Sequence, residues 1–289
     1  MLLLRPGEYR KLWERAAAHA EPGAVDYTGV ARVLASPHDI SPDVAVTTDQ
    51  IETARAALEG TGLRQETLQS FVDAFTLNTG HAGRLLSLLR GSPAVRVISG
   101  EVQPTPEMRA LAAPAGHETL SLHELHILGP DGSPAEHQTI QVIKSTVDEL
   151  TSYPYRFDTD ELAVEVVRGG SVGDRIYRIG DTLYGVDIVL NRPLARGETT
   201  LMQVRTTFFY RTPPAPEFRR GVLRTTKDAT IWVKFHPDRV PARVWSARWD
   251  RVDHARVTAR EEAELDDELS VHLRYDAIER AIVGFTWEW

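Results

Sequence analysis

Ten histidines are the richest supply of groups in this chain that could bind a metal or transfer protons. His123 and His126 stand closest together, in the segment HELH. On a strand, residues three positions apart point to opposite faces, so these two side chains cannot close on one ion. The remaining histidines considered lie on separate expected elements: His117, His137, His236, His254 and His272. The histidine pattern therefore predicts no metal site.

Other segments with catalytic residue types also lack the spacing that chemistry requires. The acidic run at 261–268 has carboxylates in number but not the spaced ligands and turn glycine of a calcium loop. The glycines of VVRGGSVGD lead into a strand rather than a helix, with no Lys-Ser/Thr after them, so they do not predict a phosphate-binding loop. No GxSxG segment is present. We predict no catalytic residue and no cofactor.

Aromatic side chains gather near the end of the chain. Five of the six tryptophans lie within the last sixty residues. Such a group forms either a core wall or a recognition surface, and the core is the commoner use. The alternation of Phe285, Trp287 and Trp289 predicts a final strand that packs into the core. The candidate ligand or partner surface consists of Trp232, Trp245 and Trp249.

Composition limits the partners that the protein can bind. The formal charge of -8 and pI near 5.7 disfavour polyanions and membrane surfaces except through a local basic patch. There is no cysteine, which excludes disulfides and thiolate chemistry. The apolar run at the start, MLLLRPGEYRKLW, is too short for the core of a signal peptide or for a transmembrane span. We expect a cytoplasmic protein, and its preference for arginine over lysine indicates a GC-rich bacterial genome.

The first part of the chain has the periodicity of short helices. Apolar residues recur at helical spacing in five segments separated by proline, glycine or asparagine. The third segment opens at Thr47 with an N-cap residue and closes at Gly60. We predict a five-helix bundle from the segments 7–19, 27–35, 47–60, 66–77 and 81–89.

The order of these helices resembles the helix-turn-helix domain of the phage-repressor-like (Xre-type) regulators of actinobacteria. The resemblance covers residues 8–91 and rests on TGVARVLA as the first helix of the motif, TTDQIETARAALEG as the second and GLRQETLQSFVDAF as the support helix. In that family the second helix enters the major groove. The resemblance therefore implies contact with DNA through Thr47, Thr48, Gln50 and Arg55.

The segment departs from this family in two ways. The connection SPHDISPDVAV is longer than the usual tight turn. The expected reading helix carries Asp49 and Glu52, with Arg55 as its only base, although phosphate neutralisation normally dominates DNA affinity. A degenerate helical bundle that makes no contact with DNA is therefore an equal alternative.

The rest of the chain is organised around the segment 183–210, which we interpret as two strands. Tyr184, Val186, Ile188 and Leu190 alternate in the first arm, and the segment 202–208 repeats the pattern. Between the arms, RPLARGE has the composition of a reversal. The pattern predicts a long antiparallel pair.

Further alternating runs occur about every ten to fifteen residues, which is typical of a sandwich. They include VRVI at 95–98, a hairpin of the segments 120–127 and 139–147 around the turn GPDG, and a strand at 230–236. The predicted fold class is α+β: a helical domain at 1–95, followed by an antiparallel, immunoglobulin-like β-sandwich at 96–289.

Three hypotheses of function fit these expectations, two of them non-catalytic and one catalytic. The leading hypothesis is a non-catalytic bacterial regulator that binds DNA through its helices and a ligand, a partner or a second copy through its sandwich. Its rivals are a protein-protein adaptor and an enzyme whose site lies at the junction of the two domains.

Overall fold

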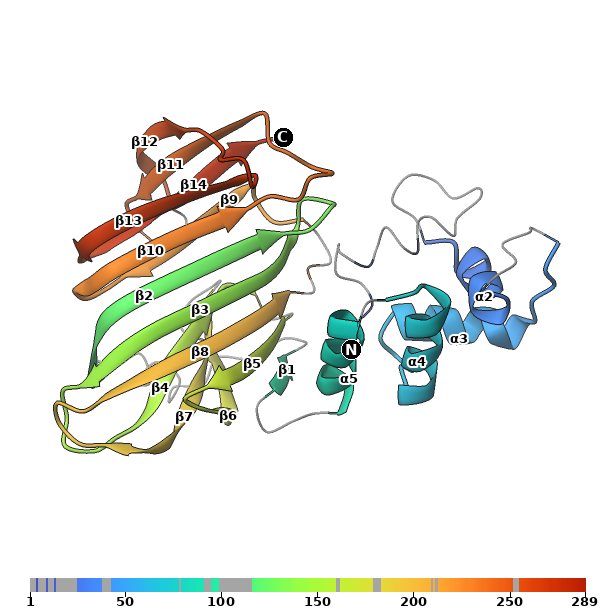
Figure 1. The fold of residues 1–289 in the computed structure, drawn as a ribbon, viewed down its shortest axis with the longest axis horizontal. Coiled ribbons are helices and arrows are strands. Elements are labelled where there is room, and N and C mark those ends of the chain that lie inside the picture. The colour runs from blue at the N-terminus through green and yellow to red at the C-terminus, as the bar shows by residue number, and fades with distance from the viewer. Residues whose placement is uncertain are drawn as a thin grey trace. The chain divides into compact units, whose positions relative to one another are not determined.

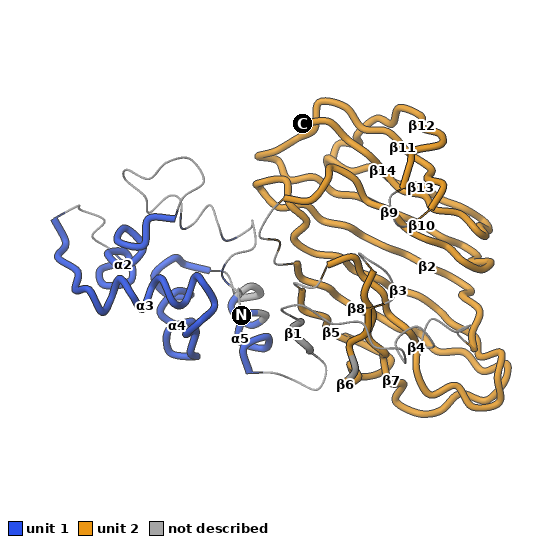
Figure 2. Tube along the Cα trace, turned by 180° about the vertical axis from the view of Figure 1, so that it is seen from behind, with its two compact units in different colours: residues 1–92 blue, residues 93–289 orange. Residues whose placement is uncertain are grey.

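The chain divides into two compact units, residues 1–92 and residues 93–289, each coloured separately in Figure 2. The computed structural model describes residues 4, 9, 13, 25–37, 43–77, 79–90, 95–98, 116–159, 162–178, 183–208, 210, 213–251 and 255–289. Within these ranges the backbone alone is described at 79–81, 84, 95–98 and 175. The division places the strand VRVI with the β-rich unit.

The prediction of a five-helix bundle is wrong. The described part of the first unit contains four helices (Figure 1): α2 (Tyr27–Ala35), α3 (Thr48–Leu58), α4 (Gln65–Ala74) and α5 (Thr79–Arg90). The first expected helix, at 7–19, lies outside the described residues except for Tyr9 and Trp13. Short helices depend on tertiary packing, so periodicity in a segment does not fix whether and where a helix forms.

Local signals in the sequence explain where α2 and α3 begin. The Asp26 carboxylate accepts a hydrogen bond from the Gly29 amide at 2.9 Å. Thr47 and Gln50 form a capping box at the start of α3. The core of this unit includes Leu68 and Phe71, which are fully buried, and Trp13, whose ring meets Phe71 edge-on at 5.2 Å. No helix within the described residues has both the length and the apolar composition needed to cross a bilayer.

The second unit contains fourteen strands in its described part, arranged in three sheets (Figure 1). The seven-stranded sheet has the order β1 (Val95–Ile98), β5 (Leu162–Arg168), β8 (Thr199–Phe208), β3 (Pro134–Ser145), β2 (His117–Leu128), β10 (Thr226–Lys234), β13 (Ser270–Ile278). The four-stranded sheet has the order β12 (Val257–Ala263), β11 (Arg243–Trp249), β14 (Ala281–Glu288), β9 (Glu217–Val222). The three-stranded sheet has the order β4 (Leu150–Phe157), β7 (Tyr184–Leu194), β6 (Gly170–Arg178).

This topology corrects the prediction of an antiparallel, immunoglobulin-like sandwich. An immunoglobulin-type fold has two antiparallel sheets, whereas this unit has three, and β10 runs parallel to β2 in the largest. Alternation identifies a strand with one buried face, but it carries no information on which strand lies beside it or in which direction. The number of sheets was therefore beyond what the pattern could predict.

The prediction that the two strands at 183–210 pair with each other is also wrong, although both strands exist. β7 pairs with β4 and β6, whereas β8 pairs with β3 and β5 in a different sheet. The chain changes layer at the intervening turn, where the Glu198 carboxylate accepts hydrogen bonds from Arg192 and from the Ala195 amide. The apolar faces of the two strands meet across the core instead of lying side by side.

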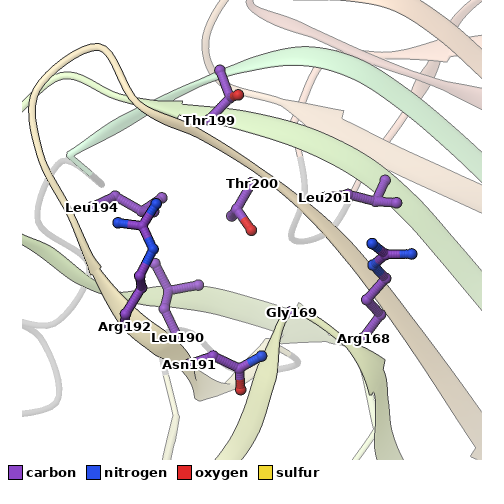
Figure 3. A pocket seen from close by; sticks show the side chains of 9 residues that line it. All are labelled: Arg168, Gly169, Leu190, Asn191, Arg192, Leu194, Thr199, Thr200 and Leu201. Carbon is purple, nitrogen blue, oxygen red and sulfur yellow. The ribbon is translucent and has the colours of Figure 1, made fainter.

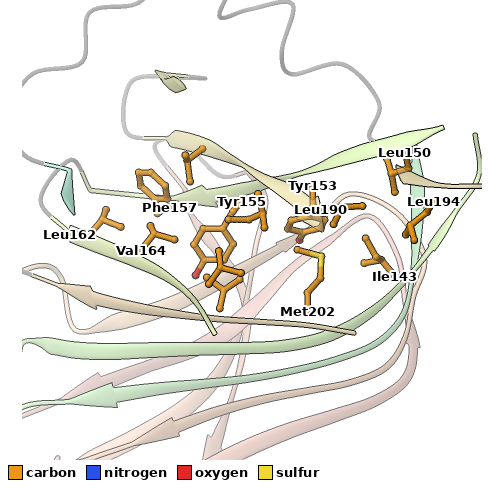
Figure 4. Close-up of a cluster of buried hydrophobic side chains, with 14 of the residues drawn as sticks. Ile143, Leu150, Tyr153, Tyr155, Phe157, Leu162, Val164, Leu190, Leu194 and Met202 are labelled. Atoms are coloured by element: carbon orange, nitrogen blue, oxygen red, sulfur yellow. The ribbon is translucent and has the colours of Figure 1, made fainter. Parts of the chain in front are cut away.

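Two apolar clusters hold the layers together. Figure 4 shows the first, in which side chains from the three-stranded sheet such as Tyr155 and Leu190 pack against Val164 and Met202 of the seven-stranded sheet. The second joins the four-stranded sheet to β2, β10 and β13. It contains Phe285 and Trp287, which are 0% and 3% exposed, as the alternation in the last strand predicted. Trp289, the third residue of that alternation, lies beyond β14 and is 40% exposed, so the prediction is wrong for this residue. Both smaller sheets therefore pack on the large sheet.

The hairpin expected around GPDG is confirmed, but its buried face differs from the leucine pattern. β2 and β3 pair across the turn, where Gly132 adopts a positive φ of 80° and donates a hydrogen bond to the Gly129 carbonyl. The buried side chains of β2 are Leu122, Glu124, His126 and Leu128. Leu125 and Ile127, in contrast, lie on the other face and are half-buried.

Candidate functional site

The N-terminus of α3 uses two of its expected DNA-contacting residues for capping. The Gln50 side-chain oxygen accepts hydrogen bonds from the Thr47 amide at 2.8 Å and from the Thr47 hydroxyl at 3.2 Å. The Thr47 hydroxyl in turn accepts from the Gln50 amide at 3.3 Å. Thr48 is exposed in the first turn. The oxygen with which Gln50 would read an adenine is therefore already engaged.

Arg55, the fourth expected contact, is held within the helical unit. Its guanidinium lies 3.6 Å from the Glu52 carboxylate, one turn earlier on α3. It also lies over the ring of Tyr27 on α2, at 5.1 Å from the ring centroid. The Tyr27 hydroxyl donates to Glu59 at 3.1 Å. The structure thus places Thr47, Thr48, Gln50 and Arg55 on one helix, but the arginine faces other side chains of its own unit.

The surface around α3 is acidic. Residues 43–77 contain six acidic and two basic side chains. Asp49 and Glu52 are exposed on α3 itself, and Glu59 is exposed at its C-cap. Phosphate groups would be repelled by this surface unless basic side chains elsewhere compensated. The positive face that a DNA-reading helix needs is not present in this part of the unit.

The aromatic candidate surface is divided by the fold. Trp232 lies half-buried on β10, on the face of the large sheet opposite the two smaller sheets, aligned with Leu125 and His272. Trp245 and Trp249 are 5% and 6% exposed on β11. The guanidinium carbons of Arg243 and Arg260 each lie 4.7 Å from the Trp245 ring centroid. Trp232, Trp245 and Trp249 therefore do not form one surface.

An open pocket of about 300 Å³ lies where β5, β7 and β8 approach one another (Figure 3). Arg168 and Arg192 stand on opposite sides of it, with Asn191 and the hydroxyl of Thr200 between them. The Arg192 guanidinium is already bound to Glu198 at 2.9 Å. Most of the residues that line the pocket are exposed.

The most unusual chemistry lies inside the second unit, in a group that we call the polar seam. It consists of Glu124 and His126 on β2, His137, Thr139 and Gln141 on β3, and Arg220 on β9. The register of β2 and β3 places His126 opposite His137 and Glu124 opposite Thr139. The same face is apolar on either side, because Ile231 of β10 aligns with Glu124 and Val204 of β8 aligns with Thr139. The seam therefore separates the two apolar clusters.

A buried ion pair lies at the centre of the polar seam. Arg220 donates to the Glu124 carboxylate at 2.6 Å, and the His137 Nε2 atom lies 3.7 Å from the same oxygen. The Glu124 side chain is fully buried, and that of Arg220 is 28% exposed. Burial acts to raise the pKa of Glu124, but Arg220 and then His137 outweigh it and hold the pKa below its usual value. Glu124 is therefore ionised.

Two groups beside this pair, His126 and Tyr155, are neutral. Burial, together with the nearby His137, lowers the pKa of His126 well below its usual value. Its ring stacks on Phe218 of β9 with the centroids 4.5 Å apart. Beside them, Tyr155 of β4 and Thr206 of β8 share a hydrogen bond of 2.8 Å, and burial raises the pKa of this tyrosine to about 12. The edge strand β9 of the four-stranded sheet thus contributes Arg220 to the polar seam, and the edge strand β4 of the three-stranded sheet places Tyr155 beside it.

Many polar atoms of the seam have no hydrogen-bond partner in the protein. Eight of them are buried: Glu124 Oε2, both ring nitrogens of His126, His137 Nδ1, Thr139 Oγ1, Gln141 Nε2 and Oε1, and Arg220 Nε. A buried polar atom without a partner costs roughly 1–3 kcal/mol. Eight such atoms would together cost on the order of the whole stability of a domain, about 5–15 kcal/mol. The seam must therefore be satisfied in another way.

Sequence reasoning missed the polar seam. His137 was placed on a separate element from His126, and Glu124 was not singled out. The available signal was the turn GPDG, because a hairpin closed at 129–133 brings His126 and His137 opposite each other. Arg220 had no such signal, since it comes from a strand 96 residues away from Glu124. No group of three histidine or acidic side chains within the described residues is arranged to hold a metal ion.

Comparisons with known proteins give matches to solved structures alone. No family model and no curated protein matches the chain. Among solved structures, a candidate protease from Parabacteroides distasonis aligns with a TM-score of 0.37 and 11% identity over 60% of this chain and 41% of its own. An M1 zinc metallopeptidase from Deinococcus radiodurans aligns with a TM-score of 0.29 and 13% identity over 59% and 43% of the two chains. Alignments this weak bear neither on the fold nor on the activity of this chain.

Proposed function

We propose that the protein is a non-catalytic bacterial adaptor whose helical unit binds a protein partner through the acidic surface around α3. The observation that carries this proposal is the state of Arg55. The one basic side chain of α3 is engaged by Glu52 and Tyr27 within the helical unit, and residues 43–77 around it contain six acidic and two basic side chains. The proposal includes the cytoplasmic location that the sequence led us to expect.

The charge of this surface indicates the chemistry of the partner. Asp49 and Glu52 on α3 and Glu59 at its C-cap are exposed, and basic side chains are scarce in the residues around them. Electrostatic complementarity steers association and selects partners by charge. The partner is therefore a protein that presents a basic surface. DNA contact through Thr47, Thr48, Gln50 and Arg55 stays a prediction, and the same charges count against it.

A charge-reversal experiment tests the adaptor proposal. Partners captured by the full chain in its source cells are identified, purified and titrated against wild type and against Glu52→Lys/Glu59→Lys. We expect binding at least roughly tenfold weaker in the variant, because like charges then face each other. We also expect wild-type binding to weaken as salt is added.

The matched control is Glu118→Lys, which reverses an exposed charge on β2 in the other unit. It should bind the partner as wild type does. Equal affinity of wild type and Glu52→Lys/Glu59→Lys, with both proteins folded by circular dichroism, would remove the α3 surface from the proposal.

A further inference from the structure

The polar seam brings together buried donors and acceptors that the protein leaves unpaired. Arg220 Nε can only donate, and Glu124 Oε2 can only accept. The Gln141 amide does both through separate atoms, and a neutral imidazole at His126 also offers one donor and one acceptor. All of them lie within one stripe of a single sheet face or directly above it.

This mixture decides the chemistry of what binds there. A cation would satisfy Glu124 but would lie close to the Arg220 guanidinium, and an anion would face the reverse conflict. The described residues also provide no metal-binding group. The occupant must be small and uncharged, and it must donate and accept in several directions. Water has these properties, and buried water typically makes about three hydrogen bonds to otherwise unpaired polar groups.

We propose that the polar seam is an internal hydration site, in which ordered water molecules bridge Gln141, His126 and His137 to the Glu124–Arg220 pair. The bridges run from β2 and β3 of the large sheet to β9 of the four-stranded sheet. The water therefore forms part of the joint at which the smaller sheets are fixed on the large one.

A crystal structure of the full-length chain, at a resolution that shows water, tests the site directly. We expect ordered water density within hydrogen-bond distance of at least two of the eight unpaired atoms. Seam side chains that instead pair directly with one another would overturn the proposal. Density too large for water would assign the site to a small polar solute and would also overturn it.

A solution measurement on a variant tests the same site independently. Magnetic relaxation dispersion of water nuclei counts water molecules that are held inside a protein for long periods. Gln141→Leu removes one donor and one acceptor from the seam, so the count should fall relative to wild type. Gln138→Leu, on the opposite face of the same strand, should leave the count unchanged.

Circular dichroism establishes that both variants are folded. A folded Gln141→Leu protein with the wild-type count of internal water would contradict the proposal. If Gln141→Leu does not fold, the wild-type crystal density decides the question alone.

Discussion

At the scale of single residues, the second unit depends on charges that it has removed from water. Glu124 is fully buried, and its partner Arg220 reaches it from another sheet. Two ions buried together add little to stability compared with apolar residues, but one ion left alone is costly. The pair therefore fixes how the four-stranded sheet sits on the large sheet more than it adds to stability.

Glu124→Gln tests this view of the pair. The substitution keeps the size of the side chain but leaves the Arg220 guanidinium without its counter-charge. We expect the free energy of unfolding to fall by about 3 kcal/mol, the lower end for a broken buried pair, because Arg220 is partly exposed. Chemical denaturation measures it, with the exposed Glu118→Gln as control. A loss as small as that of the control would show that the pair is not coupled to folding.

Burial of His126 makes the free energy of unfolding of the second unit depend on pH. Its pKa is lower in the folded protein than in the unfolded chain, where it is about 6.5. The unfolded chain therefore takes up a proton first, so stability is full above that value and declines as the pH falls below it. Unfolding followed from about pH 7.5 to about pH 5.5 should show a smaller decline in His126→Phe than in wild type. His123→Phe, on the half-exposed opposite face, should keep the wild-type decline.

At the scale of elements, the sequence located strands better than it paired them. β7 and β8 both appear in the predicted segment, and Phe285 and Trp287 lie in the core as expected, whereas Trp289 is exposed. The pairing failed because each strand has one apolar face whether its neighbour lies in the same sheet or across the core. The polar seam was missed for a related reason: Glu124 and His126 occupy inward positions of β2 that a hydrophobic pattern assigns to apolar side chains.

Replacing Trp287 tests whether the final strand packs into the core. It is 3% exposed, and its ring meets Phe235 edge-on at 5.4 Å. Trp287→Ala should cost about 3–5 kcal/mol, the usual loss for a large aromatic side chain in a packed core. Thermal unfolding measures the loss, and Glu288→Ala on the opposite, exposed face should leave the melting temperature close to wild type. An unchanged melting temperature for both variants would place Trp287 outside the core.

At the scale of the whole molecule, the second unit has apolar clusters of its own. Both clusters are built from residues beyond the first ninety-two, so we expect this unit to fold without the helices. A fragment of residues 93–289 should therefore unfold in one cooperative transition. Differential scanning calorimetry of this fragment and of the full chain provides the comparison. A broad, non-cooperative transition of the fragment would show that the helical unit completes its core.

The central proposal concerns the helical unit: the surface around α3 binds protein and not DNA. The most direct measurement is the fluorescence anisotropy of labelled DNA from the region upstream of the gene, titrated with the full chain at low salt, where phosphate contacts are strongest. The account predicts no binding by wild type, and no change in Gln50→Ala or Arg55→Ala. Tight, salt-sensitive binding that both substitutions weaken would contradict the account and would establish α3 as a DNA-reading helix.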